Sequence, residues 1–193
     1  VNHNLGVVPE MMWVKMRSPG TNGRWFVNSS ELGADEHLEL NDSVGLSTEV
    51  TMFNATRPTD SVFTLGTNYH SNYSTYTYIA YLFATLPNIS KVGSYTGNGT
   101  SQTIAAGFSA GSKFIIIKRK TNGSTGDWFM WDTTRGIVSG NDPHLSLNTT
   151  AAEVTTDDSI DPDTSGFIVN QNATTNINVT SATYIYYSIA TPL

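Results

Sequence analysis

The stretch KFIIIKRK at residues 113–120 decides how this chain is interpreted, because EMMWVKMR at residues 10–17 repeats its pattern. A segment rich in Gly, Ser, Thr and Asn follows each stretch, and then comes a Trp-Phe pair, Trp25-Phe26 or Trp128-Phe129. His-Leu-x-Leu-Asn follows at 37–41 and at 144–148, and each copy closes with a Tyr-rich run. Such internal repetition indicates two similar modules. It also disfavours an enzyme, because a catalytic pair present in one copy only would need a special reason.

Short apolar runs bounded by turn residues predict strands along the whole chain. HLEL and HLSL alternate as half-buried strands do, whereas the continuous apolar run at 114–117 predicts a central strand buried on both faces. No helical period of ten or more residues is present, although 47–55 and 148–158 could each hold a short helical turn. The sequence therefore predicts an all-β fold of two tandem β-sandwich, jelly-roll-like modules.

The repeat also places the module boundaries. We expect a divergent first module at 1–86, a linker at 87–91 and a second module at 92–193. Pro87 ends the first copy because it cannot donate to a strand ladder. The second copy opens with a strand-turn-strand segment that the first copy lacks, so either the chain is a piece of a longer protein or the first module has a smaller sheet. Both Trp rings, Trp25 and Trp128, are expected to be mostly buried at equivalent places, and Tyr78 should correspond to Tyr184.

Composition excludes several classes of protein. The net charge is −6 with only 10 Lys and Arg residues, so the basic stripe of a nucleic-acid-binding protein is missing. No apolar run reaches the roughly 18 residues of a membrane span, and we expect no membrane insertion. There is no cysteine, which excludes disulfides. Charged residues make up only 13%, and hydroxyl and amide side chains dominate, a surface typical of extracellular β-proteins.

The second copy resembles a known family of virion modules. The resemblance rests on the order and spacing of GSYTGNGTSQTIAAGFSAGSKFIIIKRK (93–120), WFMWDTTRG (128–136), LSLNTTAAEVTTDDS (145–159), SGFIV (165–169) and YIYYSIA (184–190). These blocks resemble a repeated β-module of tail-fibre and other virion structural proteins of tailed, especially marine, bacteriophages. The resemblance implies a β-sandwich on the surface of an extracellular particle, with other virion subunits as partners and a homo-oligomeric assembly. It implies no enzyme and no catalytic set.

Two groups of polar side chains are candidate sites. Asp132 and Arg135 lie three residues apart around a turn, where the guanidinium can pair with the carboxylate. We interpret this pair as a structural turn clamp, and the alternative is a sugar-binding carboxylate. Tyr73, Tyr76 and His70 precede the first Tyr-rich run, and exposed aromatic rings there could stack on sugars or enter a subunit interface. They are the candidate surface-contact residues.

No cofactor or metal is expected. Asp157, Asp158, Asp161 and Asp163 could hold Ca²⁺ as clustered carboxylates, but their spacing does not match an EF-hand loop and Asp also favours turns. His37 and His144 occupy the same slot in both copies without a second ligand at metal spacing. No catalytic triad or glycosidase-like carboxylate pair stands out.

The sequence thus predicts a structural virion protein, a tail fibre or related appendage, that could also adhere to a host-surface glycan. Two alternatives remain open at this point. One is a capsid-decoration or other assembly subunit. The other is a carbohydrate-active enzyme on a sandwich, which two facing carboxylates in a cleft would reveal.

Overall fold

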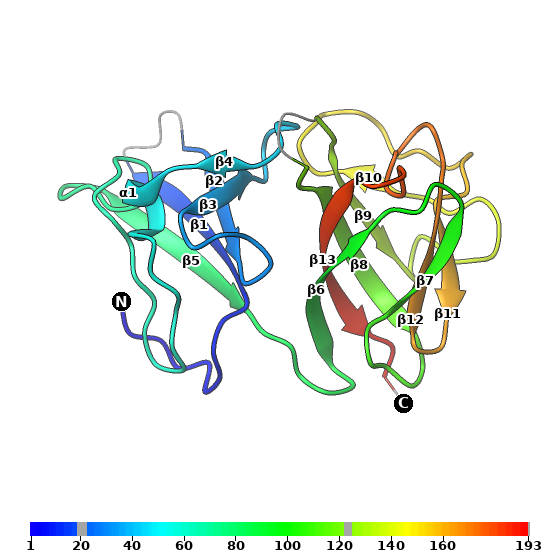
Figure 1. Cartoon of the computed structure of the whole chain (residues 1–193), viewed down its shortest axis with the longest axis horizontal. Helices are drawn as coiled ribbons and strands as arrows, with labels where there is room; N and C mark the ends of the chain where they lie inside the picture. Colours follow the sequence, from blue (N-terminus) through cyan, green and yellow to red (C-terminus); the bar gives the residue numbers. More distant parts are fainter. Residues whose placement is uncertain (19–22, 122–124, 193) are drawn as a thin grey trace. The chain divides into compact units, whose positions relative to one another are not determined.

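The computed structural model describes residues 1–18, 23–121 and 125–192, and these residues form two compact units (Figure 1). The fold is all-β, as predicted, with three antiparallel sheets and one short helix in the described part of the chain. The linker expected at 87–91 is shorter than predicted, because a strand already begins at Ser90. Unit 1 comprises Val1–Asn41 and Leu46–Ala84, and unit 2 comprises Asp42–Gly45 and Thr85–Leu193.

Unit 1 contains one five-stranded sheet in the order β4-β3-β2-β1-β5. Every pairing is antiparallel, and β1 lies between β2 and β5. The run HLEL at 37–40, predicted as a strand, contributes its first three residues to β3, although burial does not alternate there because His37 and Leu38 are both buried. The strands are β1 (Met11–Ser18), β2 (Trp25–Ser29), β3 (Glu36–Glu39), β4 (Ser47–Thr48) and β5 (Thr77–Phe83).

A single helical turn covers one face of this sheet. Helix α1 (Val50–Phe53) lies within the segment in which the sequence allows a helical turn, and Glu49 caps it by accepting a hydrogen bond from the Thr51 backbone N–H. Met52 and Phe53 of α1 are buried against the sheet. The buried partners, which come from β1, β2 and a loop, are Met12, Val14, Phe26 and Phe63.

The two-sheet sandwich predicted for the first module is realised differently in unit 1. The described residues supply no second sheet there, and α1 with the loop residue Phe63 takes its place as the second layer. Asn54 and Ala55 have left-handed backbone angles and Pro58 follows, so the segment after α1 turns repeatedly instead of extending. The layering is of the sandwich type, with coil and helix replacing the second sheet.

Unit 2 is a sandwich of two sheets. A five-stranded sheet has the order β10-β9-β8-β13-β6, and a three-stranded sheet has the order β11-β12-β7. The strands are β6 (Ser90–Thr96), β7 (Ser101–Ala105), β8 (Ser112–Arg119), β9 (Trp128–Asp132), β10 (Leu145–Ser146), β11 (Ile160–Asp163), β12 (Gly166–Asn170) and β13 (Thr183–Ala190).

The core of unit 2 lies between its two sheets. Ile115, Ile117 and Trp131 project from the larger sheet and are fully buried. Phe167 and Val169 of β12 meet them from the smaller sheet. Ile116 points to the other face of β8 and is buried as well, which confirms the prediction of a central strand buried on both faces. Burial of each such side chain contributes about 1.5–3 kcal/mol.

The internal repeat is visible in the strand order. β3-β2-β1-β5 in unit 1 corresponds to β10-β9-β8-β13 in unit 2. Trp25 pairs with Lys15 across β1 and β2, and Trp128 pairs with Lys118 across β8 and β9. The predicted burial holds for both rings: Trp128 is fully buried, and Trp25 is partly shielded and stacks on Tyr81 at 5.9 Å between ring centroids.

Candidate functional site

The candidate site of unit 2 lies where β9 begins, and an asparagine fixes the backbone there. The backbone N–H of Trp128 donates to Asn148 Oδ1 at 2.7 Å, and the N–H of Leu147 donates to the Trp128 carbonyl at 2.8 Å. Asn148 Nδ2 in turn donates to Asp127 Oδ1 at 2.8 Å. One amide side chain therefore holds both the first residue of the strand and the carboxylate that precedes it.

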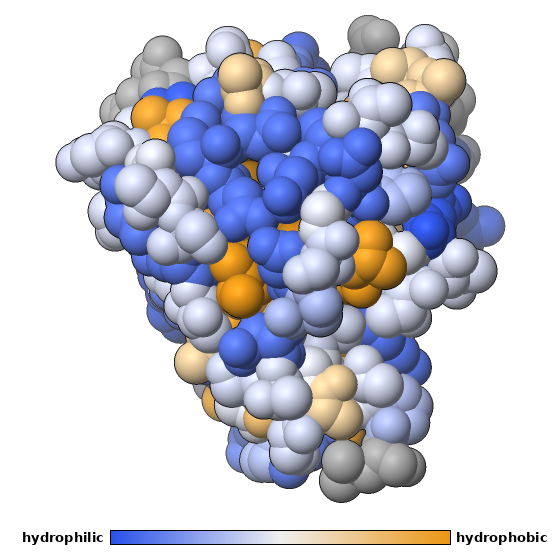
Figure 2. Space-filling model, turned by 90° about the vertical axis from the view of Figure 1, so that its right-hand side faces the viewer, coloured by the Kyte–Doolittle hydropathy of each residue, from blue (hydrophilic) through white to orange (hydrophobic). Residues whose placement is uncertain are grey.

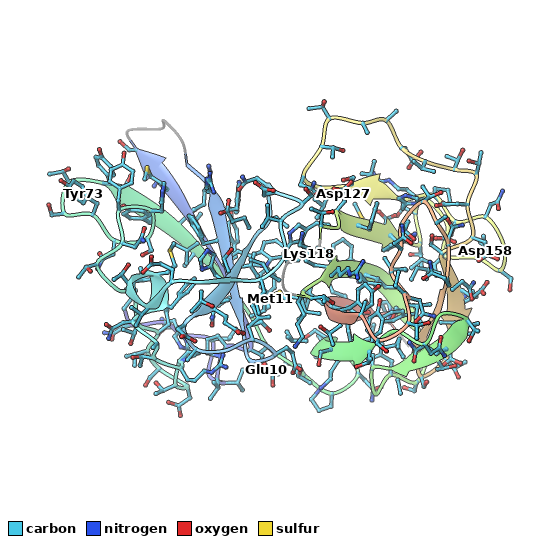
Figure 3. The ribbon with its side chains drawn as sticks, turned by 45° about the horizontal axis from the view of Figure 1, so that its top comes forward. Glu10, Met11, Tyr73, Lys118, Asp127 and Asp158 are labelled. Carbon is cyan, nitrogen blue, oxygen red and sulfur yellow. The ribbon has the colours of Figure 1, made fainter. Side chains whose placement is uncertain are left out.

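Beneath this point lies a fully buried lysine. Lys118 Nζ donates to the Gly126 carbonyl at 2.5 Å and to the Asp42 carbonyl at 3.2 Å, and it lies 5.9 Å from the centroid of the Trp128 ring. Burial lowers the pKa of Lys118 to about 8, although the carboxylates of Asp127 and Asp42 act in the opposite direction. The ammonium thus links the loop that contains Asp42 to the loop that contains Gly126. Lys118 and Asp127 are labelled in Figure 3.

A tyrosine positions the opposite wall. Tyr184 Oη donates to the Asn176 carbonyl at 2.7 Å and accepts from the Val179 N–H at 3.0 Å. Asn172 supports the same loop, because its Oδ1 accepts from the Thr174 N–H at 2.8 Å. These hydrogen bonds fix the backbone of the loop formed by Thr174, Thr175 and Asn176.

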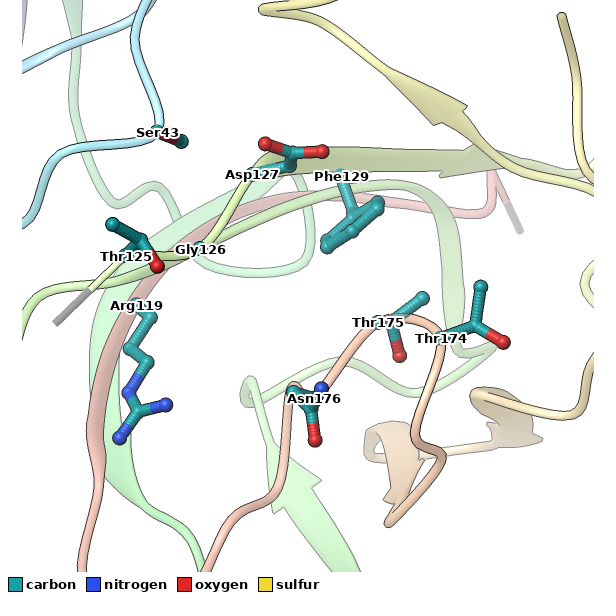
Figure 4. A pocket seen from close by; sticks show the side chains of 9 residues that line it. All are labelled: Ser43, Arg119, Thr125, Gly126, Asp127, Phe129, Thr174, Thr175 and Asn176. Atoms are coloured by element: carbon teal, nitrogen blue, oxygen red, sulfur yellow. The ribbon is translucent and has the colours of Figure 1, made fainter. Parts of the chain in front are cut away.

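These elements enclose a pocket of about 490 Å³ (Figure 4). Arg119 comes from the end of β8, and its buried Nε has no hydrogen-bond partner among the described residues. Such an unpaired buried donor is costly unless a ligand or water satisfies it. Most of the lining consists of hydroxyl, amide and backbone groups. The lining residues are Ser43, Arg119, Thr125, Gly126, Asp127, Phe129, Thr174, Thr175 and Asn176.

No motif of the sequence predicts this pocket directly. The repeat aligns Lys15 with Lys118 and Asn41 with Asn148. These shared residues lie next to the pocket and are an indirect sequence signal for its position. Arg119 gives no such signal, because Met16 occupies its slot in the first copy and part of the pocket comes from a loop more than fifty residues further along the chain.

The two residues of the expected turn clamp are in contact. Arg135 Nη1 forms an ion pair with Asp132 Oδ2, and Asp132 Oδ1 accepts from the backbone N–H groups of Thr134 and Arg135, each at 2.9 Å. Arg135 Nε also pairs with Glu153 Oε1 at 2.9 Å. The bonds of Asp132 close one turn, the Glu153 pair joins this turn to a more distant segment, and neither Asp132 nor Arg135 is among the described residues that line the pocket of Figure 4.

The expected surface-contact residues form an aromatic cluster in unit 1. The rings of Tyr69, Tyr73 and Tyr76 lie 5.1–5.4 Å apart, and Tyr73 is 47% exposed. His70 packs edge-on against Tyr69 at 5.2 Å and is half-buried. The structure therefore brings all three predicted residues into one neighbourhood.

The Asp-rich loop is occupied by internal contacts. Asp158 and Asp161 both accept from Asn170 Nδ2, at 2.7 and 2.8 Å, and Asp163 accepts from the Ser165 N–H and hydroxyl. Within the described residues, no three His, Asp or Glu side chains are arranged to hold a metal ion. Figure 3 shows Asp158 well away from Asp127.

A buried polar cluster lies near the same loop. His144 Nδ1 is 3.2 Å from Asp157 Oδ1, and Asp142 Oδ1 accepts from the backbone N–H groups of Ser159 and Ile160. Burial raises the pKa of Asp142 to about 7, against the effect of these two donors. Asp142 and His144 are at most 1% exposed, so neither can reach a substrate in this conformation.

A comparison with family profiles matches residues 1–192, and thus both units, to a domain of unknown function. The chain belongs to the DUF7483 family. The family domain spans both copies of the repeat. No curated protein and no solved structure matches the chain. Among the described residues, no helix has the length and apolarity needed to cross a membrane.

Proposed function

We propose that this member of the DUF7483 family is a non-catalytic structural module of a virion surface, a tail fibre or related appendage, that binds host-surface glycans. The pocket of unit 2 carries the proposal, because an unpaired guanidinium N–H of Arg119 lies at a lining of hydroxyl and amide groups with one carboxylate, Asp127. The resemblance of residues 93–190 to virion modules supports the virion assignment.

The lining matches the chemistry of a neutral sugar. Sugar hydroxyls both donate and accept, so they complement the hydroxyls of Thr174 and Thr125 and the amide of Asn176. The Asp127 carboxylate can accept from two neighbouring sugar hydroxyls while Arg119 donates to a third. Figure 2 shows a mostly hydrophilic surface with small apolar spots on the side of unit 2 seen there, which favours polar ligands over an extended apolar partner.

The number of carboxylates in the pocket favours a binding role over hydrolysis. A glycosidase of the common type places two carboxyl groups about 5–5.5 Å or 6.5–9.5 Å apart across the sugar. The described lining of the pocket contains one, Asp127, and its Oδ1 already accepts from Asn148. Asp127 is therefore suited to orient a sugar, and the proposal includes no catalytic residue.

Weak single sites would act together in a virion. A shallow polar site typically binds near 1 mM, where the binding free energy is about −4 kcal/mol. Joining many copies in a homo-oligomer raises avidity by about 10²–10⁴ without new contacts. The proposal therefore includes a homo-oligomer of this chain, which other virion subunits attach to the particle.

Glycan arrays probed with the chain displayed on multivalent beads test the proposal. Arg119→Met keeps the aliphatic stem and removes the guanidinium, so glycan binding should fall while thermal stability is kept. Lys113→Met makes the same charge change on a side chain outside the pocket lining and should leave binding intact. Steady release of reducing sugar, abolished by Asp127→Asn, would replace the binding proposal with an enzymatic one. Absence of any glycan signal would overturn it in favour of an assembly subunit.

A further inference from the structure

Unit 1 contains a second pocket at the position equivalent to the pocket of unit 2. Its volume is about 510 Å³, close to the 490 Å³ of the unit 2 pocket. In the repeat, Gly23 and Arg24 occupy the slots of Gly126 and Asp127, and Asn41 occupies that of Asn148. The described lining residues are Gly23, Arg24, Asn41 and His70.

The same backbone anchors build both pockets. Asn41 Oδ1 accepts from the Trp25 N–H at 2.6 Å, as Asn148 does from Trp128. Lys15 Nζ donates to the Gly23 carbonyl and lies 5.7 Å from the Trp25 ring, as Lys118 does with Gly126 and Trp128.

The opposite wall is anchored in the same way. Tyr78 Oη donates to the Tyr69 carbonyl at 2.7 Å and accepts from the Tyr73 N–H at 2.9 Å, as Tyr184 does with Asn176 and Val179. The second pocket is therefore a repeated feature of the fold, built by the same anchors as the first.

The charges of the two pockets differ. The unit 2 pocket has two cations and two carboxylates in or near its lining. The cations are Lys118 and Arg119, and the carboxylates are Asp127 and Asp42. In unit 1, Arg24 replaces the aspartate, and Lys15 and Arg24 are balanced by one carboxylate, Glu39, which pairs with Arg24 Nη1 at 2.6 Å. The Arg24 side chain is 52% exposed, so its guanidinium remains accessible to a ligand while one donor pairs with Glu39.

The ring of His70 lines the same pocket as Arg24. The buried Nδ1 of His70 has no hydrogen-bond partner among the described residues. Its ring contacts Tyr69, and Tyr69 joins the partly exposed cluster with Tyr73 and Tyr76. Arg24 and His70 line one pocket, and the exposed tyrosine rings adjoin His70. This arrangement suits a sugar ring that carries an anionic group, because aromatic rings pack on a sugar and Arg24 can form charge-assisted hydrogen bonds.

We propose that the unit 1 pocket is a second glycan site, specific for a sugar bearing a carboxylate or sulfate group. Arg24 binds the anionic group, and His70 with the Tyr69 cluster contacts the ring. This inference rests on the proposed glycan-binding function. One chain would then carry two unlike sites, one for neutral and one for acidic sugars.

Ligand titration followed by NMR on the full chain tests the inference, with methyl glucoside as the neutral probe and methyl glucuronide and galactose 6-sulfate as acidic probes. Arg24→Met should weaken the acidic probes by at least about tenfold, since a hydrogen bond to a charged group is lost, and should leave the glucoside unchanged. Arg119→Met should do the reverse. Arg17→Met, an exposed arginine outside the pocket lining, is the matched control and should change neither.

The outcomes separate the two proposals. Acidic probes that are unaffected by Arg24→Met, or that fail to bind while the glucoside binds and depends on Arg119, would overturn the second site alone. Acidic binding lost with Arg119→Met but kept in Arg24→Met would place both ligands in unit 2 and also overturn it. Failure of every probe to bind in the millimolar range would overturn the glycan-binding function itself.

Discussion

Replacement of the buried Lys118 by methionine should change how the stability of unit 2 depends on pH. The folded pKa of Lys118 is about 8, against 10.5 for an ordinary lysine. Because the folded pKa is lowered, the unfolded chain binds the extra proton between these values, and the free energy of unfolding rises with pH through this window. From pH 7 to pH 9.5 the rise is about 2 kcal/mol, since each unit of pKa difference corresponds to 1.36 kcal/mol. Lys118→Met should remove this rise.

Chemical denaturation at a series of pH values between 7 and 9.5, followed by tryptophan fluorescence, measures the effect. Burial raises the folded pKa of Tyr95, Tyr184 and Tyr187, and their effect on stability is the same in the parent and in Lys118→Met, so the difference between the two proteins isolates the lysine. Lys15→Met changes the corresponding lysine of unit 1 and should leave the rise in place. If the parent chain and Lys118→Met show the same pH dependence, the assignment of the rise to a buried, desolvated ammonium is wrong.

Three further changes test other parts of unit 2. Arg135→Ala should lower thermal stability by about 1 kcal/mol or less, because the pair with Asp132 is partly exposed, and glycan binding should persist; loss of binding at unchanged stability would make the turn a site. The raised pKa of the Asp142 carboxyl should lower the free energy of unfolding of the parent by at most about 4 kcal/mol as pH rises from about 4 to 7. Asp142→Asn should remove this fall. Urea denaturation series in which both proteins show the same dependence of unfolding free energy on pH would contradict this. Phe167→Ala should cost about 3–5 kcal/mol in urea denaturation, because its ring is fully buried between the sheets, and a cost below 1 kcal/mol would contradict that packing.

The strands and their repeat could be predicted from the sequence because they depend on local patterns. The apolar run at 114–117 reports directly which side chains are buried. The run HLEL at 37–40 marks a strand correctly, although the consecutive residues His37 and Leu38 are both buried there. The Asp132–Arg135 contact was also predictable, since the two residues lie within one turn. Each of these features is determined by neighbours a few residues away.

The remaining features depend on contacts between distant segments. Lys118 is a charged residue at the end of a strand, and only the carbonyls of Gly126 and Asp42 explain why it can be fully buried. The unit 2 pocket combines Arg119 with the Thr174–Asn176 loop, which no pattern joins in the sequence. The missing second sheet of unit 1 also escaped prediction, because apolar residues such as Phe63 fill a core equally well from a loop.

The duplicated anchors bear on how such a protein could diversify. Lys15 and Lys118, Asn41 and Asn148, and Tyr78 and Tyr184 bond to backbone groups, so their task does not depend on which side chains border the cavity. The rim can therefore exchange Asp127 for Arg24 without loss of the frame beneath it. After a gene duplication, side chains on the rim of one copy could therefore change while the buried anchors of both copies stayed the same.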